Sequence, residues 1–232
     1  MRPYLILKLE GVMQAWGGHT FEDRRPSELF PTRSGLLGLL AACLGIDRRD
    51  DERQQALAES VIFTVRVDCP PLKMTDYHTV KNSRLDYKSL KSAETIQTWR
   101  EYLLDAKYTV AVAATEAATV SLDDIALALH KPVFTPFLGR RSCPLGRPLL
   151  VESVTAKNAK DALHSIVISR VDSDHRLPSE APQTLTFYTE ELESGAAPLW
   201  LRDKPIPGRR RQFATRQVSI ISETQGGNHV SE

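Results

Sequence analysis

The amino-acid sequence predicts an α+β fold, and three features of the chain lead to this prediction. The first third contains a strand, a helix and a second strand in succession, which is a β-α-β unit. A loosely similar unit follows, and the last third contains strand candidates separated by polar, proline-containing loops. With 232 residues, 41% of them hydrophobic, the chain is long enough to build a core within one large or two small domains.

The first unit begins with an apolar strand that ends at Gly11 and is expected to be buried on at least one face. After a loop rich in Gly, His and Arg, either Thr32 or Ser34 can cap a helix that Gly45 ends. A charged turn at residues 47–53 leads to a short helix and to a strand with alternating apolar residues. We therefore expect elements at Tyr4–Leu9, Thr32–Leu44, Gln54–Glu59 and Val61–Val67.

The middle of the chain predicts an insertion followed by the second unit. Residues 69–93 are polar, basic and irregular in pattern, which is typical of an insertion. Ile96–Leu103 and Tyr108–Ala113 are expected to pair as strands around Asp105, although the first of these segments also fits a helix. Ser121 and Asp124 resemble a capping box for a helix that runs to about His130 before Pro132.

The C-terminal third is less regular and predicts a small β-rich region. A short helix is possible at Asn158–His164, and residues 225–232 are expected to form a disordered tail. Leu192, Leu199 and Trp200 are apolar residues that fit either a core or a patch covered on assembly. The strand candidates are Leu149–Val154, Ile166–Val171, Leu185–Thr189 and Gln212–Ile221. We expect a first domain at residues 1–150 and a second region at 151–232.

Two arginine-rich segments are prominent because the chain as a whole is almost neutral. The net charge is only +1, yet residues 137–148 contain Arg140, Arg141 and Arg147 with no acid. Residues 207–216 add four arginines, again with no acid: Arg209, Arg210, Arg211 and Arg216. Glycines and prolines shape the first segment into a loop, so guanidinium groups and backbone N–H groups there are suited to phosphate. The alternative is two solvated clusters on unrelated faces.

Two further segments near the N-terminus are candidates for binding a nucleic acid. At residues 32–35, a loop enters a helix, so free N–H groups, hydroxyls and Arg33 converge on a possible anion site, with Arg24 and Arg25 upstream. The alternative is an ordinary helix cap with a solvent-exposed arginine. Trp16 follows the first strand beside a glycine and could stack on a base, although such a residue is more often part of the core.

Catalytic chemistry has a weaker basis in the sequence. Tyr77 and His78 with Lys81, or His130 with Lys131, supply the side-chain types for metal-independent RNA cleavage, but such neighbours also arise by chance. The three cysteines are widely spaced and indicate neither a disulfide framework nor a metal site, and no motif indicates a cofactor. No segment is long and apolar enough for a membrane span or a signal peptide, so we expect a cytoplasmic location and no membrane partner.

Several segments together resemble the fifth CRISPR-associated protein family, in the form found in the type I-E surveillance complex Cascade. The resemblance covers about residues 1–150 firmly and becomes weak over 154–208. It depends on the segments Tyr4–Leu9, Met13–Gly17, Phe30–Leu40, Asp76–Val80, Glu94–Leu103, Phe137–Pro148 and Arg211–Ala214.

The resemblance implies a ferredoxin-like, RRM-related palm from which a thumb protrudes at about residues 69–106. It also implies a non-catalytic RNA-binding subunit in antiviral defence, which holds the 5′ handle of the CRISPR RNA and caps the backbone of the complex. The implied partners are the backbone and large subunits, with target DNA reached through the complex. Type I-C relatives instead cut precursor RNA with a Tyr and a Lys-His pair. Here His130 and Lys131 have the reversed order, which counts against cleavage. An endoribonuclease acting through His78 or His130 is therefore kept only as the alternative.

With the arginine segments and the resemblance considered together, we expect phosphate contacts from arginines and stacking from aromatic residues. The candidate RNA-binding residues are Gln14, Trp16, Arg24, Arg25, Arg33, Ser34, Gly35, Tyr77, His78, Lys81, Arg140, Arg141, Arg209, Arg210, Arg211 and Arg216. No catalytic residue and no metal ligand is assigned.

Overall fold

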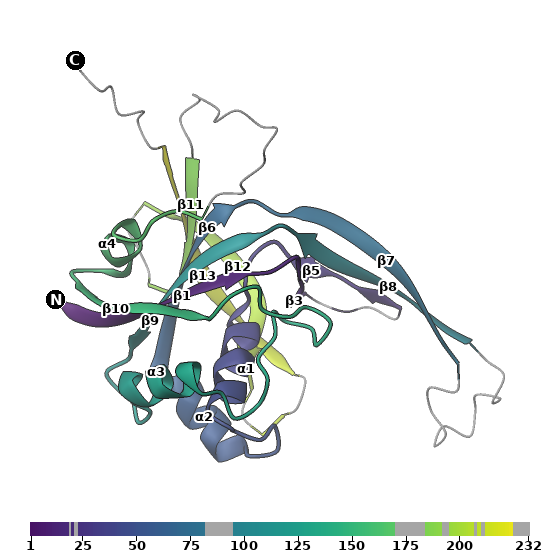
Figure 1. Cartoon of the computed structure of the whole chain (residues 1–232), viewed down its shortest axis with the longest axis horizontal. Helices are drawn as coiled ribbons and strands as arrows, with labels where there is room; N and C mark the ends of the chain where they lie inside the picture. The colour runs from purple at the N-terminus through teal and green to yellow at the C-terminus, as the bar shows by residue number, and fades with distance from the viewer. Residues whose placement is uncertain are drawn as a thin grey trace.

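The fold was analysed in a computed structural model, which describes residues 1–18, 20, 23–81, 95–169, 184–191, 195–206, 208–209 and 212–224. Its centre is a seven-stranded antiparallel sheet in the order β10-β1-β9-β6-β11-β13-β12 (Figure 1). The strands are β1 (Arg2–Glu10), β6 (Val61–Cys69), β9 (Lys107–Ala114), β10 (Leu150–Ala156), β11 (Thr184–Thr189), β12 (Ala197–Pro205) and β13 (Phe213–Thr224). Together with the helices, this sheet confirms the predicted α+β class.

Each helix begins at a residue whose side chain accepts a backbone N–H. The helices are α1 (Arg33–Cys43), α2 (Asp51–Ser60), α3 (Leu122–His130) and α4 (Ala159–His164), capped by Thr32, Asp50, Ser121 and Asn158. Thr32 is thus the cap of α1 rather than Ser34. The prediction for α2 was wrong by three residues at its start, because Asp50 accepts the N–H of Arg53 at 3.0 Å and starts the helix inside the charged turn.

The central sheet separates two apolar cores. On one face, α1, α2 and α3 pack against β1, β6 and β9 through residues such as Leu7, Leu40 and Val112. On the opposite face, α4 packs through Leu163 against Ile6 and other residues of the sheet. The six residues Tyr4–Leu9 are all buried, since β1 lies between both cores. Figure 1 shows α1, α2 and α3 on one side of the sheet and α4 on the other.

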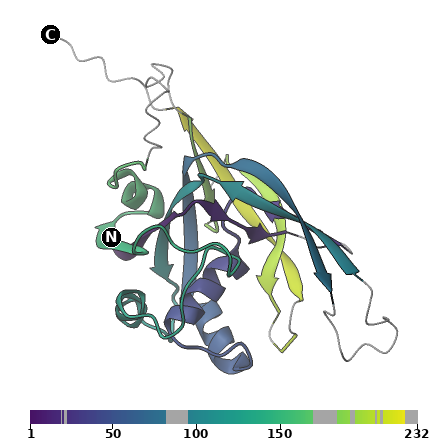
Figure 2. The same cartoon turned by 45° about the vertical axis from the view of Figure 1, so that its right-hand side comes forward.

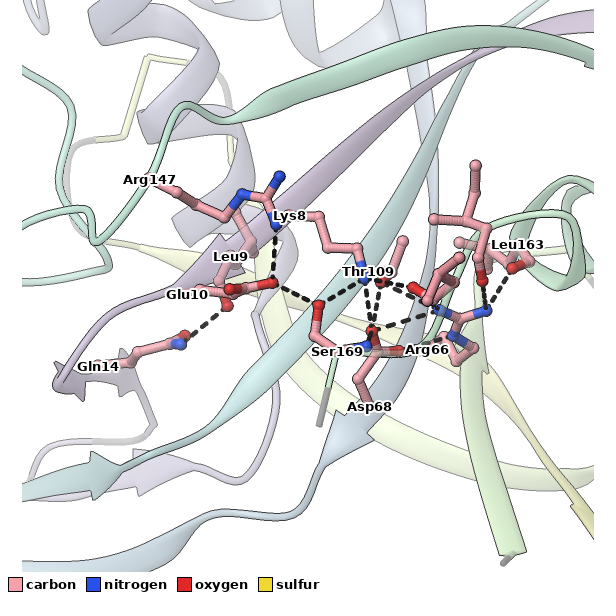
Figure 3. Close-up of polar contacts among 12 residues, drawn as sticks. Lys8, Leu9, Glu10, Gln14, Arg66, Asp68, Thr109, Arg147, Leu163 and Ser169 are labelled. Atoms are coloured by element: carbon pink, nitrogen blue, oxygen red, sulfur yellow. Dashed lines mark hydrogen bonds and ion pairs between the residues drawn. The ribbon is translucent and has the colours of Figure 1, made fainter. Parts of the chain in front are cut away.

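A buried charged network holds the chain after α4 against the sheet (Figure 3). Asp68 receives Lys8 Nζ at 3.0 Å and Arg66 Nε at 2.6 Å, and its side chain is fully buried. Lys8 also donates to the carbonyl of Val167 at 2.7 Å and to Ser169 Oγ at 2.6 Å. Burial alone would raise the pKa of Asp68. The hydrogen bonds and charge of Arg66, together with donors from Ser169 and Thr109, outweigh burial and lower the pKa below its ordinary value.

A long antiparallel hairpin extends from the sheet, away from the helices (Figures 1 and 2). We call it the ribbon; it consists of β7 (Leu72–Lys81) and β8 (Thr95–Leu104). The expectation of irregular structure over residues 69–93 was wrong for β7, whose ten residues all pair with β8, and residues 82–94 lie outside the described part. Of the two alternatives for Ile96–Leu103, the strand is observed, consistent with its β-branched and aromatic residues.

Short strands hold the base of the ribbon. The edge of β8 that faces away from β7 pairs with β2 (Met13–Gln14) and, in parallel, with β4 (Arg24–Arg25). A separate pair is formed by β3 (Trp16–Gly17) and β5 (Ser27–Glu28). The segment before α1 therefore supports the base of the ribbon, whose two strands continue directly from β6 and into β9 of the main sheet.

The C-terminal strands extend the sheet that the first 150 residues begin. β10 pairs with β1, and β11 pairs with β6, so residues 151–232 contribute to a shared sheet. The predicted strand at Ile166–Val171 was wrong for residues 166–169, which are not extended into a strand; the other two residues lie outside the described part, as does the tail at 225–232. β12 was not predicted from the sequence. A domain division near residue 150 stays a prediction.

Candidate nucleic-acid interface

Two of the candidate residues near the N-terminus lie entirely in the core. Gln14 and Trp16 each have 0% exposure. Gln14 Nε2 donates to the carbonyls of Leu9 and Ala106 at 3.0 and 2.7 Å, and its Oε1 accepts the indole N–H of Trp16 at 3.0 Å. Gln14 therefore provides hydrogen-bond partners for two buried backbone carbonyls and for the indole N–H of Trp16. Neither side chain presents a surface to a ligand.

The N-terminus of α1 already holds a carboxylate. The backbone N–H of Arg33 donates to Asp203 Oδ2 at 2.7 Å, and the N–H of Gly35 donates to the hydroxyl of Thr32 at 3.3 Å. Asp203 stands at the place where the sequence suggested a phosphate. Gly35 has a packing reason to be glycine, because a β carbon there would lie 2.8 Å from the ring of Trp16. Ser34, half-buried, lies 3.4 Å from the Thr32 hydroxyl.

Arg33 and Arg216 belong to one ion-pair network that joins α1 to the C-terminal strands. Arg33 pairs with Glu190 and donates to the carbonyl of Ala58 at 2.6 Å. Arg216 donates to both oxygens of Asp203, at 2.6 and 2.8 Å, and its third nitrogen lies 3.3 Å from Glu190. The arginine side chains are only 12% and 13% exposed. Their charges are therefore matched by carboxylates within the protein, and we leave both residues out of the proposed interface.

The arginine loop at residues 137–148 is shaped as the sequence predicted, but its arginines differ in environment. Gly139 has φ +83°, in the left-handed region that glycine allows. Arg140 donates to the carbonyls of Glu101 and Arg25, both at 2.9 Å, and lies 4.8 Å from the ring centre of Tyr102. Arg140 thus fastens the loop to the base of the ribbon.

The other two arginines of this loop are exposed. Arg147 lies 3.3 Å from Glu10 Oε1. Arg141 has no hydrogen bond or ion pair to any residue that the structure describes. Of the three, Arg141 is the one whose charge is available to a ligand.

The ribbon carries an aromatic pair beside an arginine, and one ring of the pair, Tyr77, is exposed while the other, Trp99, is half-buried. Tyr77 and Trp99 are directly opposite each other in β7 and β8, with ring centres 5.4 Å apart and planes inclined by 54°. Arg24 is opposite Trp99 on the other edge of β8, and its guanidinium carbon lies 5.8 Å from the indole centre. Tyr77 is 50% exposed, and Arg24 is exposed as well. This is an arrangement in which an aromatic surface and a cation are presented together.

Strand alternation decides which other side chains share this face of the ribbon. Lys81 is four residues after Tyr77 on β7, so it lies on the same face, and it is exposed. Lys73 is on this face too and pairs with Glu101 at 2.8 Å. Burial alone would raise the pKa of Glu101, but the hydrogen bond from Lys73 and the N–H of Ser27 lower it. We call Arg24, Tyr77, Lys81 and Trp99 the ribbon patch.

The residues considered for RNA cleavage are not brought together. His78 lies on the opposite face of the ribbon from Tyr77, where its Nε2 is 2.6 Å from Asp76 Oδ2. His130 and Lys131 are at the end of α3, which packs on α1, β1 and β10 rather than on the ribbon. Among the residues that the structure describes, no group of His, Cys, Asp and Glu side chains could hold a metal ion.

The remaining candidates are placed as follows. Arg25 is half-buried next to Arg24, and Arg209 is exposed near the turn between β12 and β13. Arg210 and Arg211 lie outside the described residues. Trp99 was not among the predicted binding residues, because only the register of β7 and β8 places it opposite Tyr77. In the part of the chain that the structure describes, every helix falls short of the length and apolar character that a membrane crossing requires.

Comparison with known proteins gives consistent matches over the whole chain. The family model described as CRISPR-associated protein (Cas_Cas5) matches residues 4–218. The CRISPR system Cascade subunit CasD of Escherichia coli (strain K12) is 47% identical over 241 residues, covering 100% of each chain. A chain of a CRISPR RNA-guided surveillance complex superposes with a TM-score of 0.72 and 30% identity, over 96% of this chain and 90% of the other. A crystal structure of a Cas protein gives 0.62 and 25%, over 97% and 95%.

Proposed function

The chain belongs to the CRISPR-associated protein family Cas5, and from this premise we propose that it is a non-catalytic, RNA-binding subunit of an RNA-guided surveillance complex. In this proposal, it holds the 5′ handle of the CRISPR RNA and caps one end of the complex. The similarity to a Cascade subunit over the full length of both chains supports the assignment to such a complex. The observation that carries the RNA-binding role is the exposed ring of Tyr77 beside the half-buried ring of Trp99, with the exposed Arg24 next to them.

We further infer that β1, β6, β9 and β10 with α1 and α3 form a ferredoxin-like palm. The order β10-β1-β9-β6 supports this inference, since it places the fourth strand beside the first and the third beside the second. α1 and α2 follow β1, α3 follows β9, and all neighbouring strands are antiparallel. The ribbon lies between the second and third strands of this unit, which is where a thumb would be inserted.

The ribbon patch suits a single-stranded RNA that is recognised by its shape. A base that stacks on Trp99 or Tyr77 contributes about 1 to 3 kcal/mol, and such stacking tolerates any base. Arg24 and Lys81 would meet the phosphates on either side, with Arg141 as a further cation. This division of tasks requires no catalytic group, because phosphate contacts position the strand and stacking fixes individual nucleotides.

The partners that follow from this role are the backbone and large subunits of the complex. Target DNA would be reached through the assembled complex rather than by this chain alone. A subunit that is assembled on CRISPR RNA is expected to act in the cytoplasm, in antiviral defence. Which surface meets each partner subunit stays a prediction.

The alternative activity, cleavage of precursor CRISPR RNA, has less support from the geometry. A Tyr, a His and a Lys would have to converge on one phosphate, whereas Tyr77 and His78 lie on opposite faces of the ribbon and His130 lies on α3. Incubation of the purified chain in excess with labelled repeat RNA in EDTA tests this directly. We expect no cleavage; a defined product that disappears in the His78→Ala or His130→Ala variant would establish the alternative.

The RNA-binding role is tested in the assembled complex. We expect the Tyr77→Ala/Trp99→Ala variant, co-expressed with the other subunits, to retain CRISPR RNA about 10-fold less well or worse, because at least one stacked base is lost. Phe134→Ala is the matched control, since it removes an aromatic ring that is 49% exposed at another surface. Equal RNA retention by wild type and the double variant, in complexes of the same subunit composition, would reject the ribbon patch.

A further inference from the structure

A second exposed surface with aromatic and basic character lies on β12. Exposure alternates along this strand: Trp200, Arg202 and Lys204 face outward, whereas Leu201 and Asp203 are buried. Trp200 is 65% exposed, a large fraction for a tryptophan in the middle of a strand. We call Trp200, Arg202 and Lys204 the β12 strip.

The described structure leaves the outward face of β12 uncovered. α1 packs against the opposite face, where Leu199 and Leu201 join the core. β12 ends the order of the sheet, so its only strand neighbour is β13 among the residues that the structure describes. Arg202 reaches across β13 and donates to the carbonyl of Phe213 at 3.0 Å. The strip is therefore a surface held by secondary structure rather than part of a loop.

The strip has no negative charge beside it on the described strands. Asp203, the one acid of β12, points to the other face and is held by Arg216 and by the backbone of Arg33. Glu223, the one acid of β13, is paired with Lys160 and His164 at the other end of that strand. Arg209, near the turn between β12 and β13, adds a further exposed cation. On the described residues of β12 and β13, a polyanion approaching the strip would therefore meet cations and no unpaired acid.

We propose that the β12 strip is a second binding surface for single-stranded nucleic acid, with Trp200 stacking on a base and Arg202 and Lys204 contacting phosphates. Trp200, Arg202 and Lys204 are successive exposed side chains of β12, and the register with β13 shifts between Leu201 and Lys204, so one ring and two cations lie along the same exposed face. An acidic side chain would use the cations alone, whereas each nucleotide supplies both a phosphate for the cations and a base for the exposed face of the indole. The proposal rests on the proposed function for the presence of RNA, but it uses different residues.

The two surfaces are arranged on hairpins that project in a common direction. Figures 1 and 2 both show the β12–β13 hairpin and the ribbon extending to the same side of the molecule, away from α4. This arrangement favours one RNA strand that contacts both surfaces.

The tryptophans provide separate signals for the two surfaces. The chain has three tryptophans, and Trp16 is fully buried. In the Trp99→Phe variant, the change of fluorescence on adding RNA therefore reports Trp200, and in Trp200→Phe it reports Trp99. The probe is a short single-stranded polyuridylate, titrated into the purified full chain at several salt concentrations.

We expect RNA to quench Trp200 in the Trp99→Phe protein. Adding Arg202→Gln and Lys204→Gln should weaken this response on the order of 10-fold and lower the salt slope by about 1.4, since about 0.7 is lost for each phosphate contact to a single strand. The control is Arg48→Gln/Arg49→Gln in the same background, which removes the same charge from the exposed turn before α2 and should leave the Trp200 response unchanged.

Each other outcome overturns a different statement. If RNA quenches Trp99 in Trp200→Phe but leaves Trp200 unaffected in Trp99→Phe, the β12 strip is rejected while the ribbon patch stands. Quenching of Trp200 alone would reject the ribbon patch instead, and no response of either tryptophan would reject both. An oligoglutamate of equal charge that produces the same Trp200 response at the same salt would show a site for acidic protein and also reject the proposal.

Discussion

A β carbon at Gly139 would lie 1.7 Å from the carbonyl oxygen of Ala15, closer than any non-bonded contact permits. The same residue has φ +83°, and its neighbours Leu138 and Ala15 are joined by a backbone hydrogen bond of 3.1 Å. The arginine loop is therefore fastened to the segment between β2 and β3 at a point where only glycine fits. The position of Arg140 and Arg141 depends on this contact.

We expect Gly139→Ala to lower the free energy of unfolding by about 3 kcal/mol or more, because both the backbone conformation and the contact with Ala15 are lost. Gly195→Ala is the matched control, since Gly195 has the same φ of +83° but open space around its β position. The control should cost only about 1 to 2 kcal/mol, the penalty for left-handed backbone. Chemical denaturation measures both; equal losses would mean that the contact with Ala15 is unimportant.

Arg140 and Arg141 are neighbours with opposite expected effects. Arg140→Ala removes donors to two carbonyls and should lower the free energy of unfolding by about 1 to 3 kcal/mol. Arg141→Ala should leave stability within about 0.5 kcal/mol and instead lower the salt slope of RNA retention by about 0.7. Denaturation and RNA retention at several salt concentrations separate the two. A salt slope that falls with Arg140→Ala but not with Arg141→Ala would reverse the assignment.

The residue types at the candidate site were predictable from the sequence, but their partners were not. Arg33 and its partner Glu190 are 157 positions apart, and nothing local to Arg33 indicates that its charge is neutralised. Tyr77 was identified as a stacking candidate, whereas Trp99 becomes its neighbour only through the register of β7 and β8. Sequence patterns report one strand or helix at a time, and pairing between distant segments decides which charges and rings stay exposed.

At the scale of elements, patterns with a clear period were predicted well. β1, α1, β6, α3 and α4 lie where apolar spacing and capping residues placed them. β7 was taken as irregular because its half-buried face carries Asp76 and His78 as well as Met74, so burial alternates along the strand without an alternation of apolar residues. β12 was missed because three apolar residues, Leu199–Leu201, are followed by three charged residues, Arg202–Lys204, so the sequence shows no alternation, and Pro198 and Pro205 flank this stretch.

The packing of the chain after α4 onto the sheet should depend on pH through Asp68. A carboxyl whose pKa is lowered by folding contributes stability above its unfolded value of 3.8 and loses it as pH falls through the folded value. Asp68→Asn should therefore cost about 3 to 5 kcal/mol at pH 7, because Lys8 and Arg66 lose their buried partner.

The difference in free energy of unfolding between wild type and Asp68→Asn should begin to shrink below about pH 4, where the carboxyl of the unfolded chain becomes protonated, and should continue to shrink until the folded carboxyl is protonated at lower pH. Denaturation curves between pH 7 and pH 3 measure it. Glu52→Gln, at an exposed position of α2, is the control and should stay within about 0.5 kcal/mol of wild type throughout. A difference for Asp68→Asn that is independent of pH would contradict the charged role of Asp68.

At the scale of the whole molecule, the α+β class was predictable because strands and helices alternate along the first 150 residues. The sharing of one sheet by both ends of the chain was not predictable. β11 pairs with β6, and β13 and β12 follow, so the C-terminal strands extend the sheet beyond β6. Leu201 and Val218 complete the core around α1, and the ion pairs of Arg33 join the same two regions.

We expect the described sheet to unfold in a single transition, although a domain division near residue 150 was predicted from the sequence. Chemical denaturation of Trp99→Phe and Trp200→Phe follows the fluorescence change of Trp200 with Trp16 in the first variant and of Trp99 with Trp16 in the second. After correction for any stability difference measured by circular dichroism, the two midpoints should coincide. Two separate midpoints within one variant would indicate independent domains.

The support of the ribbon has a mechanical consequence. β8 is held on its outer edge by β2 at Leu103 and Leu104 and by β4 at Trp99 and Arg100, whereas Thr95–Thr98 pair with β7 alone. The support of β8 by other strands than β7 thus ends at Trp99, and the described part of the ribbon extends about 14 Å beyond it. A nucleotide stacked on Trp99 would lie where the ribbon is supported on both edges, so its position would change least if the ribbon bends. Lys81 lies at the far end of this part of the ribbon, where bending would displace a side chain most. In the proposed role, Trp99 would hold one nucleotide while Lys81 adjusts to the phosphates beyond it.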